Sequence, residues 1–271
     1  MRYALSARSR KVLSHFAASR VLFAFDFDGT LAPIVNDPER ACMRRTTRRL
    51  LSRLARIRTC AALSGRSRAD LAVKLAGTGI QHLIGNHGAE PWAGAQRLRR
   101  AVRQWERELV RRLPDLPGLW VENKGLSLTV HYRRCRQKAE ALSAIVQAVQ
   151  SLPDVRLIRG KEAVSVVSQD APHKGMALMA EWSRLKCDGA LYVGDDETDE
   201  DVFALPDRER DLLTIRVGRK NTSRAGYFLR NQAEVDELLR LLVGVCSATV
   251  IRSPKPLTFC RCPFLVRGSD R

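Results

Sequence analysis

The amino-acid sequence predicts an α/β fold in which a parallel sheet, wrapped by helices, is interrupted by an inserted α+β block. In residues 1–96, short apolar runs alternate with helical periodicities, which is typical of a parallel sheet covered by helices. Residues 97–170 follow a different order, and the first pattern returns from Lys174. With 271 residues, the chain is long enough to bury a core without disulfide bonds or a structural metal.

The first part of the chain, residues 1–96, begins with the apolar run VLFAFDF at Val21–Phe27, which ends in carboxylates and Gly29. Such a continuous run is typical of a buried parallel strand that leads into a loop. Ser67 has the chemistry of an N-cap, with Asp70 three residues later. The elements expected here are a strand at 21–27, a helix at 46–57, a strand at 60–63, a helix at 67–75 and a strand at 82–85.

The inserted block, residues 97–170, starts with one long basic amphipathic helix and continues with alternating strand residues. We expect a helix at 97–113, strands within 120–132, a helix at 137–152 and two short strands within 155–168.

The second part of the sheet domain, residues 171–245, repeats the alternation of the first part. The expected elements are a helix at 174–185, a strand at 190–193, a helix at 199–205, a strand at 213–217 and a helix at 233–242. Residues 246–271 show no clear period, so we predict a loose C-terminal tail.

The composition is strongly basic, with 47 Lys and Arg against 29 Asp and Glu and a net charge of +18. The interpretation we favour is a charge excess spread over solvated helix faces, followed by attraction of anionic small substrates. Nucleic-acid binding is least favoured, because zinc-finger spacing and aromatic RNA-binding motifs are absent. No apolar stretch reaches the length of a membrane span, and the N-terminus lacks the apolar segment of a signal peptide. Because the seven cysteines show no metal-site spacing, we expect reduced thiols and a cytoplasmic protein.

The motif with the most specific chemistry is Asp26-Phe27-Asp28-Gly29-Thr30-Leu31, at the end of the first strand. Open α/β sheets bind their ligands at the carboxyl ends of strands. Two carboxylates this close need a cation or a proton between them, and a hard divalent ion with oxygen ligands would supply it. One carboxylate could then attack while the other moves a proton.

Three further motifs lie at expected strand ends or helix starts. Ser64-Gly65-Arg66 offers a hydroxyl and backbone N–H groups that suit an anion. Lys174, in Pro-His-Lys-Gly, suits a phosphate oxygen or a nucleophilic carboxylate. The segment Gly194–Glu200, GDDETDE, places five acidic residues within seven positions, where they would repel one another without a cation.

Together, these four motifs resemble the haloacid dehalogenase superfamily of phosphohydrolases. The segments GNHGAE (Gly85–Glu90), VENKGLSLTVHYR (Val121–Arg133), APHKG and GDDETDE, with a closing stretch at 217–235, narrow the resemblance to trehalose-6-phosphate phosphatase. The resemblance extends from about Val21 to Leu242. It implies a Rossmann-like core with an inserted cap, phosphatase activity on trehalose 6-phosphate in trehalose biosynthesis, and a functional link to trehalose-6-phosphate synthase.

The resemblance also implies roles for the core residues. Asp26 would be the nucleophile that forms an aspartyl-phosphate, and Asp28 the general acid and then the base. Ser64 and Lys174 would hold the phosphoryl oxygens. Mg²⁺ would be bound by Asp26, the backbone carbonyl of Asp28 and Asp195, while Asp196 and Asp199 would stand behind these ligands or replace them.

In the cap, the resemblance implies that Glu122 and Lys124 hydrogen-bond the sugar. The other residues expected to contact substrate are Arg66, His87, Glu90 and Arg133. Many relatives carry a Glu on the cap strand after a Gly-Lys pair, but here Ser165, or Val166 under a one-residue shift, stands at that place. Ser165 is a shorter and neutral partner for a hydroxyl group, which leaves the identity of the sugar open.

Two other functions remain as alternatives. The first is a phosphatase of the same superfamily acting on sucrose phosphate or on a glucosyl- or mannosyl-glycerate phosphate. The second is a polyanion-binding protein without catalysis, which the intact set of Asp26, Asp28, Ser64, Lys174 and Asp195 argues against, since binding alone needs no nucleophile.

Overall fold

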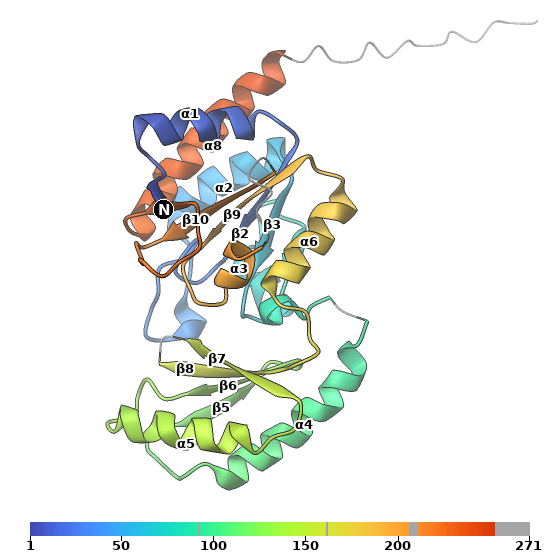
Figure 1. The fold of residues 1–271 in the computed structure, drawn as a ribbon, viewed down its shortest axis with the longest axis vertical. Helices are drawn as coiled ribbons and strands as arrows, with labels where there is room; N and C mark the ends of the chain where they lie inside the picture. Colours follow the sequence, from blue (N-terminus) through green and yellow to red (C-terminus); the bar gives the residue numbers. More distant parts are fainter. Residues whose placement is uncertain (92, 161, 206–210, 253–271) are drawn as a thin grey trace, which may run out of the picture.

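The computed structural model describes residues 1–91, 93–160, 162–205 and 211–252, and Figure 1 shows two sheets, one above the other. Within these residues, the larger sheet has seven strands in the order β1-β11-β10-β9-β2-β3-β4, and every neighbouring pair is parallel. This confirms the predicted parallel α/β core. The strands are β1 (Arg2–Tyr3), β2 (Val21–Phe25), β3 (Cys60–Leu63), β4 (His82–Ile84), β9 (Gly189–Gly194), β10 (Leu212–Val217) and β11 (Tyr227–Leu229).

Helices cover both faces of this sheet, which explains why all five residues of β2 are buried. The side chains of Phe23 and Phe25 pack toward the helices α1 (Ala7–Ala17), α2 (Arg45–Ile57), α3 (Arg68–Lys74) and α8 (Val235–Arg252). Leu22 and Ala24 point to the opposite face, against α6 (Lys174–Leu185) and α7 (Glu200–Phe203). Figure 1 shows α1, α2 and α8 stacked on one side of the sheet and α6 on the other.

The second sheet is antiparallel, with the strand order β5-β6-β8-β7 among the described residues. Its helices lie on the face away from the larger sheet (Figure 1). Leu128, Val130, Val164 and Val166 fill the space between this sheet and the two helices. The elements are α4 (Ala95–Arg112), β5 (Trp120–Asn123), β6 (Leu128–His131), α5 (Lys138–Gln150), β7 (Val155–Gly160) and β8 (Ala163–Ser168).

Single-turn 3-10 helices complete the chain at Pro38–Arg40 (η1), Asn86–Gly88 (η2) and Gln232–Glu234 (η3). Among the residues described, no helix is both long enough and apolar enough to cross a membrane.

Two terminal regions contain secondary structure that was not predicted from the sequence. The N-terminal segment forms β1 and α1, with Ser6 accepting a hydrogen bond from the backbone N–H of Ser9 as the helix cap. At the other end, α8 continues to Arg252, so Cys246, where the sequence placed the start of a loose tail, is a buried helical residue. Its thiol packs in the main core cluster, and this burial explains the longer helix. The remainder of the expected tail, residues 253–271, lies outside the described residues.

Candidate active site

The sequence-predicted motifs meet where the strand order of the larger sheet reverses. β2 lies between β3 and β9, and the chain proceeds to β4 on one side and to β10 and β11 on the other. Such a reversal opens a crevice at the carboxyl ends of the strands. Asp26 follows β2, Ser64 follows β3 and Asp195 follows β9, so the three side chains share this edge.

Three buried carboxylates form the centre of the site. Ligand oxygens of Asp26, Asp195 and Asp199 all lie within 4.8 Å of one another. Gly29 makes this approach possible, because its φ is +84° and a Cβ atom there would lie 2.2 Å from Oδ2 of Asp195. Lys174, the first residue of α6, donates from Nζ to Asp26 Oδ1 at 2.8 Å and to Asp199 Oδ1 at 2.7 Å.

The charges in this cluster are not balanced by Lys174 alone. Burial raises the pKa of Asp26 well above its ordinary value; Lys174 opposes this shift, and Asp199 and Asp195 add to it. Burial would lower the pKa of Lys174, but Asp199 and Asp26 outweigh it and raise that pKa well above its ordinary value. The cluster therefore fits a further cation, and its oxygen donors suit a hard divalent ion.

Asp199 differs from the other two carboxylates because both of its oxygens are hydrogen-bonded. Oδ1 accepts from the hydroxyl of Tyr192 at 2.7 Å as well as from Lys174, and Oδ2 accepts from the backbone N–H of Asp196 at 2.8 Å. Its burial is complete. This places Asp199 behind Asp26 and Asp195, where it orients Lys174.

Arg66, which the sequence assigned to substrate, pairs with Asp28 in this structure. Its Nε donates to Asp28 Oδ2 at 2.7 Å and its Nη2 to Oδ1 at 2.8 Å, a two-point contact. The same guanidinium donates to Asp70 Oδ2 at 2.6 Å and to the carbonyl of Pro38 at 2.8 Å. Arg66 therefore fixes the orientation of Asp28 and connects the Asp28 loop to Pro38 in η1 and to Asp70 in α3.

Ser64 and His87 form the wall next to Asp26. Ser64 is buried, and its Oγ accepts a hydrogen bond from the backbone N–H of Arg66 at 3.2 Å. The ring of His87 packs against Gly65, where a Cβ atom would lie 2.4 Å from Cε1. Burial lowers the pKa of His87 well below its ordinary value, and Lys174 and Lys124 add to this effect. His87 is thus neutral at physiological pH.

A cavity of about 500 Å³ separates this edge of the larger sheet from the second sheet, a size typical of small-molecule sites. Most of the sequence-predicted residues line it, namely Asp26, Asp28, Ser64, Arg66, His87, Glu122, Lys124, Arg133, Ser165, Lys174, Asp195 and Asp196. Two predicted residues are not part of this lining. Asp199 stands behind the carboxylates, and Glu90 accepts hydrogen bonds from the backbone N–H of Arg68 at 2.6 Å and from Asn86 Nδ2 at 2.9 Å.

The second sheet contributes the polar roof of the cavity. Glu122 Oε2 lies 2.8 Å from His131 Nε2 and 3.6 Å from Lys124 Nζ. Burial would raise the pKa of Glu122, but the hydrogen bond with His131 and the charge of Lys124 outweigh it, so the pKa is lowered. Ser165 Oγ lies 3.2 Å from Thr129 Oγ1. Glu122 is therefore an anionic hydrogen-bond acceptor beside two hydroxyl groups.

Two basic side chains at this roof reach backbone carbonyls of the core. Lys124 Nζ donates to the carbonyl of Gly65 at 3.4 Å, and Arg133 Nη1 donates to the carbonyl of Val35 at 2.7 Å. Arg133, predicted to contact substrate, thus lines the cavity and also holds a core loop.

Several residues of the site were not found from the sequence. Trp120, Thr129 and His131 line the cavity. Arg216, on β10, donates to the backbone carbonyl of Asp195 at 2.6 Å and to that of Asp196 at 3.1 Å, fixing the acidic loop. The sequence carried one signal for Arg216: it is a charged residue within the apolar run LLTIRV. A cation in a buried strand needs hydrogen-bond partners, which would have pointed to a nearby polar loop.

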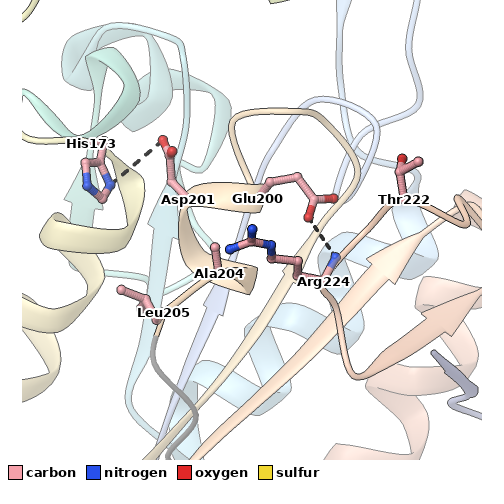
Figure 2. Close-up of a pocket in the computed structure, with 7 residues that line it drawn as sticks. All are labelled: His173, Glu200, Asp201, Ala204, Leu205, Thr222 and Arg224. Carbon is pink, nitrogen blue, oxygen red and sulfur yellow. Dashed lines mark hydrogen bonds and ion pairs between the residues drawn. The ribbon is translucent and has the colours of Figure 1, made fainter.

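A second hollow, of about 490 Å³, lies on the core and is drawn in Figure 2. Two pairs of its polar groups lie close together: His173 Nδ1 lies 3.9 Å from Asp201 Oδ2, and Glu200 Oε2 accepts a hydrogen bond from the backbone N–H of Arg224 at 2.9 Å. None of the sequence-predicted site residues lines it. Its lining residues are His173, Glu200, Asp201, Ala204, Leu205, Thr222 and Arg224. We assign this hollow no chemistry.

Comparison with known proteins gives a family match. Residues 24–232 match the family model described as trehalose-phosphatase. The chain is 30% identical over 264 residues to probable trehalose-phosphate phosphatase H of Arabidopsis thaliana, covering 86% of this chain and 74% of that protein. It is 31% identical over 258 residues to probable trehalose-phosphate phosphatase 3 of Oryza sativa subsp. japonica, covering 83% and 70%.

Solved structures share the fold. The C-terminal domain of trehalose-6-phosphate phosphatase from C. albicans has a TM-score of 0.73 at 24% identity, covering 90% of this chain and 99% of that one. Sucrose-phosphatase from Synechocystis, solved with sucrose and phosphate, has a TM-score of 0.53 at 15% identity, covering 82% and 98%.

Proposed function

Because the chain belongs to the trehalose-phosphatase family, we propose that it hydrolyses trehalose 6-phosphate to trehalose and inorganic phosphate. The observation that carries this proposal is the position of Asp26. Its carboxylate is paired with Lys174 at 2.8 Å and faces a cavity roofed by Glu122 and Lys124. A nucleophile beneath a polar roof fits a phosphate ester joined to a hydroxyl-rich group.

In the proposed reaction, a carboxylate oxygen of Asp26 attacks phosphorus and forms an aspartyl-phosphate as the bond to the sugar oxygen breaks. Asp28 donates the proton that the sugar oxygen takes. It then accepts a proton from the water that attacks the aspartyl-phosphate, which releases phosphate and restores Asp26. Lys174 and Ser64 hold the phosphoryl oxygens, and positioning of this kind accounts for most of the catalysis of phosphoryl transfer.

We propose Mg²⁺ as the cofactor, held by the side chains of Asp26 and Asp195 and the backbone carbonyl of Asp28. When bound, the ion neutralises charge on the phosphoryl oxygens and on the crowded carboxylates. Asp199 keeps its position behind these ligands, and Asp196, which lines the cavity, is available as an alternative ligand. The crowding of buried carboxylates around Asp26 supports this assignment.

Residues 97–170 are proposed to be a cap that closes over the sugar. Glu122 and Lys124 would hydrogen-bond sugar hydroxyls, and Ser165 and Thr129 offer two neutral hydroxyl groups beside them. His87 is a further neutral hydrogen-bonding group at the wall. Arg133 would help to hold the closed cap against the core through its hydrogen bond to the Val35 carbonyl, in addition to its contact with substrate.

The proposed reaction is the last step of trehalose biosynthesis, so we propose a functional link with trehalose-6-phosphate synthase, which makes the substrate. A cytoplasmic location follows from that link as part of the same proposal.

A phosphate-release assay tests the proposal. The purified protein is incubated with trehalose 6-phosphate, sucrose 6-phosphate, glucosyl- and mannosyl-glycerate phosphates and glucose 6-phosphate, with Mg²⁺ or with excess chelator. We expect the highest kcat/KM for trehalose 6-phosphate, loss of activity in chelator and its return with Mg²⁺. Full activity in chelator would contradict the metal assignment, and a higher kcat/KM for another sugar phosphate would contradict the substrate.

The second candidate function is a phosphatase for one of those other sugar phosphates. Ser165 favours this second candidate, because the roof has a neutral hydroxyl group rather than a second carboxylate at this position. The same panel decides between the two. If no ester is hydrolysed, salt-dependent binding to a polyanion such as DNA becomes the remaining candidate.

A further inference from the structure

The core-facing side of the strands β5 and β6 is polar, apart from one large aromatic residue. The strand register places Trp120 opposite His131, and Glu122 opposite Thr129, which in turn lies opposite Ser165. Side chains alternate along a strand, so Trp120, Glu122, Thr129, His131 and Ser165 share one face. The other face is the apolar one that packs on α4 and α5.

Trp120 is stacked on a neighbouring ring but remains partly exposed to solvent. Its ring centroid lies 4.1 Å from that of His131, and the two ring planes differ by 11°. The imidazole is held in turn by Glu122, at 2.8 Å from Nε2. Trp120 nevertheless keeps 46% of its surface exposed, and it lines the cavity. One face of the indole is therefore fixed from behind while much of the ring remains available to a ligand.

Trp120 also lies at the far end of the polar row from the phosphate-binding loop. Lys124 reaches the carbonyl of Gly65 in that loop. Lys124 directly follows the last residue of β5. Alternate side chains in extended backbone are spaced by roughly 6–7 Å, so Glu122 comes next and Trp120 lies about 13 Å from Lys124. A hexose attached to a phosphate at that loop would therefore end near Lys124 and Glu122, whereas a second ring would extend toward Trp120.

We propose that Trp120, backed by the stacked ring of His131, is the platform for the sugar ring farther from the phosphate, and that it selects disaccharide phosphates over hexose phosphates. This inference rests on the proposed function, because it takes the ligand to be a sugar phosphate. The C–H face of a pyranose ring packs on an aromatic ring through apolar contact, while its hydroxyl groups reach outward to Glu122, Thr129 and Ser165.

Steady-state kinetics of Trp120→Ala and Trp120→Phe test the platform. For trehalose 6-phosphate we expect Trp120→Ala to raise KM about five- to tenfold, as loss of an aromatic contact predicts, with kcat within about twofold of wild type. Trp120→Phe keeps a stacking face and should stay within about threefold of the wild-type KM. The matched control is Val110→Ala on α4, also an exposed apolar residue but outside the cavity lining.

Shorter substrates separate a platform from a structural role. Hydrolysis of glucose 6-phosphate and of acetyl phosphate should change far less in Trp120→Ala than hydrolysis of trehalose 6-phosphate. An equal loss on acetyl phosphate, or an unchanged KM for the disaccharide, would overturn the platform. If the wild-type protein does not hydrolyse trehalose 6-phosphate, the proposed function fails. The platform is then tested by the kinetics of sucrose 6-phosphate hydrolysis and by fluorescence titration with trehalose and with sucrose. Equal affinity of wild type and Trp120→Ala for these disaccharides would overturn the platform.

Discussion

The reactivity of Asp26 depends on crowding. Its side chain is buried together with two other carboxylates and one ammonium group. In the absence of a further cation, burial raises the pKa of Asp26, which would reduce its fraction in the nucleophilic, ionised form. The same crowding that disfavours ionisation therefore suits these three carboxylates to the divalent ion proposed above.

The first prediction is that Asp26→Asn abolishes turnover but leaves the fold intact. An amide has almost the same shape as the carboxylate and relieves the repulsion with Asp195 and Asp199, but it cannot attack phosphorus. We expect a rate below about one-tenth of wild type, a barrier increase of more than ~1.4 kcal/mol, with unchanged circular dichroism. The control is Asp188→Asn, at an exposed ion pair with Arg20. Retention of the wild-type rate would remove Asp26 from the role of nucleophile.

The second prediction concerns the two-point contact between Arg66 and Asp28. A Lys keeps the charge but lacks the planar fork, so it cannot hold both oxygens of Asp28 and also reach Asp70. Arg66→Lys should lower kcat at least about tenfold, as expected for loss of a charge-assisted hydrogen bond, with a smaller effect on KM. Arg68→Lys, at the exposed first residue of α3, should behave as wild type. If both variants are equally active, the orientation of Asp28 does not depend on Arg66.

The third prediction uses the buried imidazole of His87. Folding depresses the pKa of His87, so between about pH 6.5 and its folded-state pKa the unfolded chain binds a proton that the folded chain does not. Stability is therefore complete above about pH 6.5 and declines as the pH falls. From pH 7.5 to 5.5, His87 should account for about 1 kcal/mol of the lost unfolding free energy.

Urea denaturation at these two pH values measures that contribution. His87→Asn should lose less stability between them than wild type, and Asn tolerates the φ of +58° found here. His15→Gln, at an exposed position on α1, should keep the wild-type pH dependence. Identical pH dependence of His87→Asn and wild type would contradict the assignment of a neutral buried ring.

Single residues could be predicted where their chemistry is local. Asp26, Ser64 and Lys174 each follow a strand or open a helix, and those positions are visible in a short window of sequence. The partner of Arg66 was not predictable in the same way, because Asp28 is 38 positions away and meets it only through the pairing of β2 with β3.

At the scale of elements, η2 and the β5–β6 turn form a joint between the two sheets. Asn86 Oδ1 accepts from the Ser127 hydroxyl at 2.6 Å, and Asn86 Nδ2 donates to the Lys124 carbonyl at 3.3 Å and to Glu90. Asn86 and Ser127 are both buried, and Asn86 has a φ of +49°. This left-handed conformation suits Asn, whose short side chain then points across to the turn.

The fourth prediction is that Asn86 and Ser127 are energetically coupled. Asn86→Gly keeps the left-handed backbone but removes the joint, and Ser127→Ala removes one partner. Measured by urea denaturation, each variant should lose about 1 kcal/mol. The double variant should lose less than the sum, because both changes break the same hydrogen bond. Asn86→Gly combined with Ser52→Ala, a residue on α2 that bonds within its own helix, should be additive. Additivity in both pairs would mean that the joint carries no energy.

Elements were predictable where one face or both faces are continuously apolar. The strands β2, β3 and β9 and the helices α2, α4 and α6 follow from such patterns. β1 and β11 did not, because each is two or three residues long and they pair with each other across more than 220 positions. The basic residues of α1 hide its short apolar stripe, whose buried members are Leu13 and Ala17.

For the molecule as a whole, the excess of positive charge is located largely on outward-facing helices. On α4, five arginines before the last turn are exposed, and Glu108 is paired with Arg111 and Arg112. Figure 1 shows this helix on the face of the second sheet away from the larger sheet, whereas the cavity lies between the two sheets. The exposed arginines of α4 are Arg97, Arg99, Arg100, Arg103 and Arg107. Charges so placed are solvated locally, but their summed field still acts on an approaching anion.

The fifth prediction therefore concerns salt. Trehalose 6-phosphate is an anion, and a net charge of +18 should speed its encounter with the protein by an amount that ions screen. Raising NaCl from about 0.1 to 1 M shortens the Debye length from about 10 to 3 Å. kcat/KM should then fall severalfold while kcat, measured at saturating substrate, stays nearly constant.

A variant with Arg97, Arg100 and Arg103 changed to Gln tests the contribution of α4. Its kcat/KM should be lower than that of wild type at low salt and should depend less on salt, although none of these residues lines the cavity. If kcat/KM is independent of salt in both proteins, the excess charge is confined to solvated helix faces and plays no part in attracting substrate.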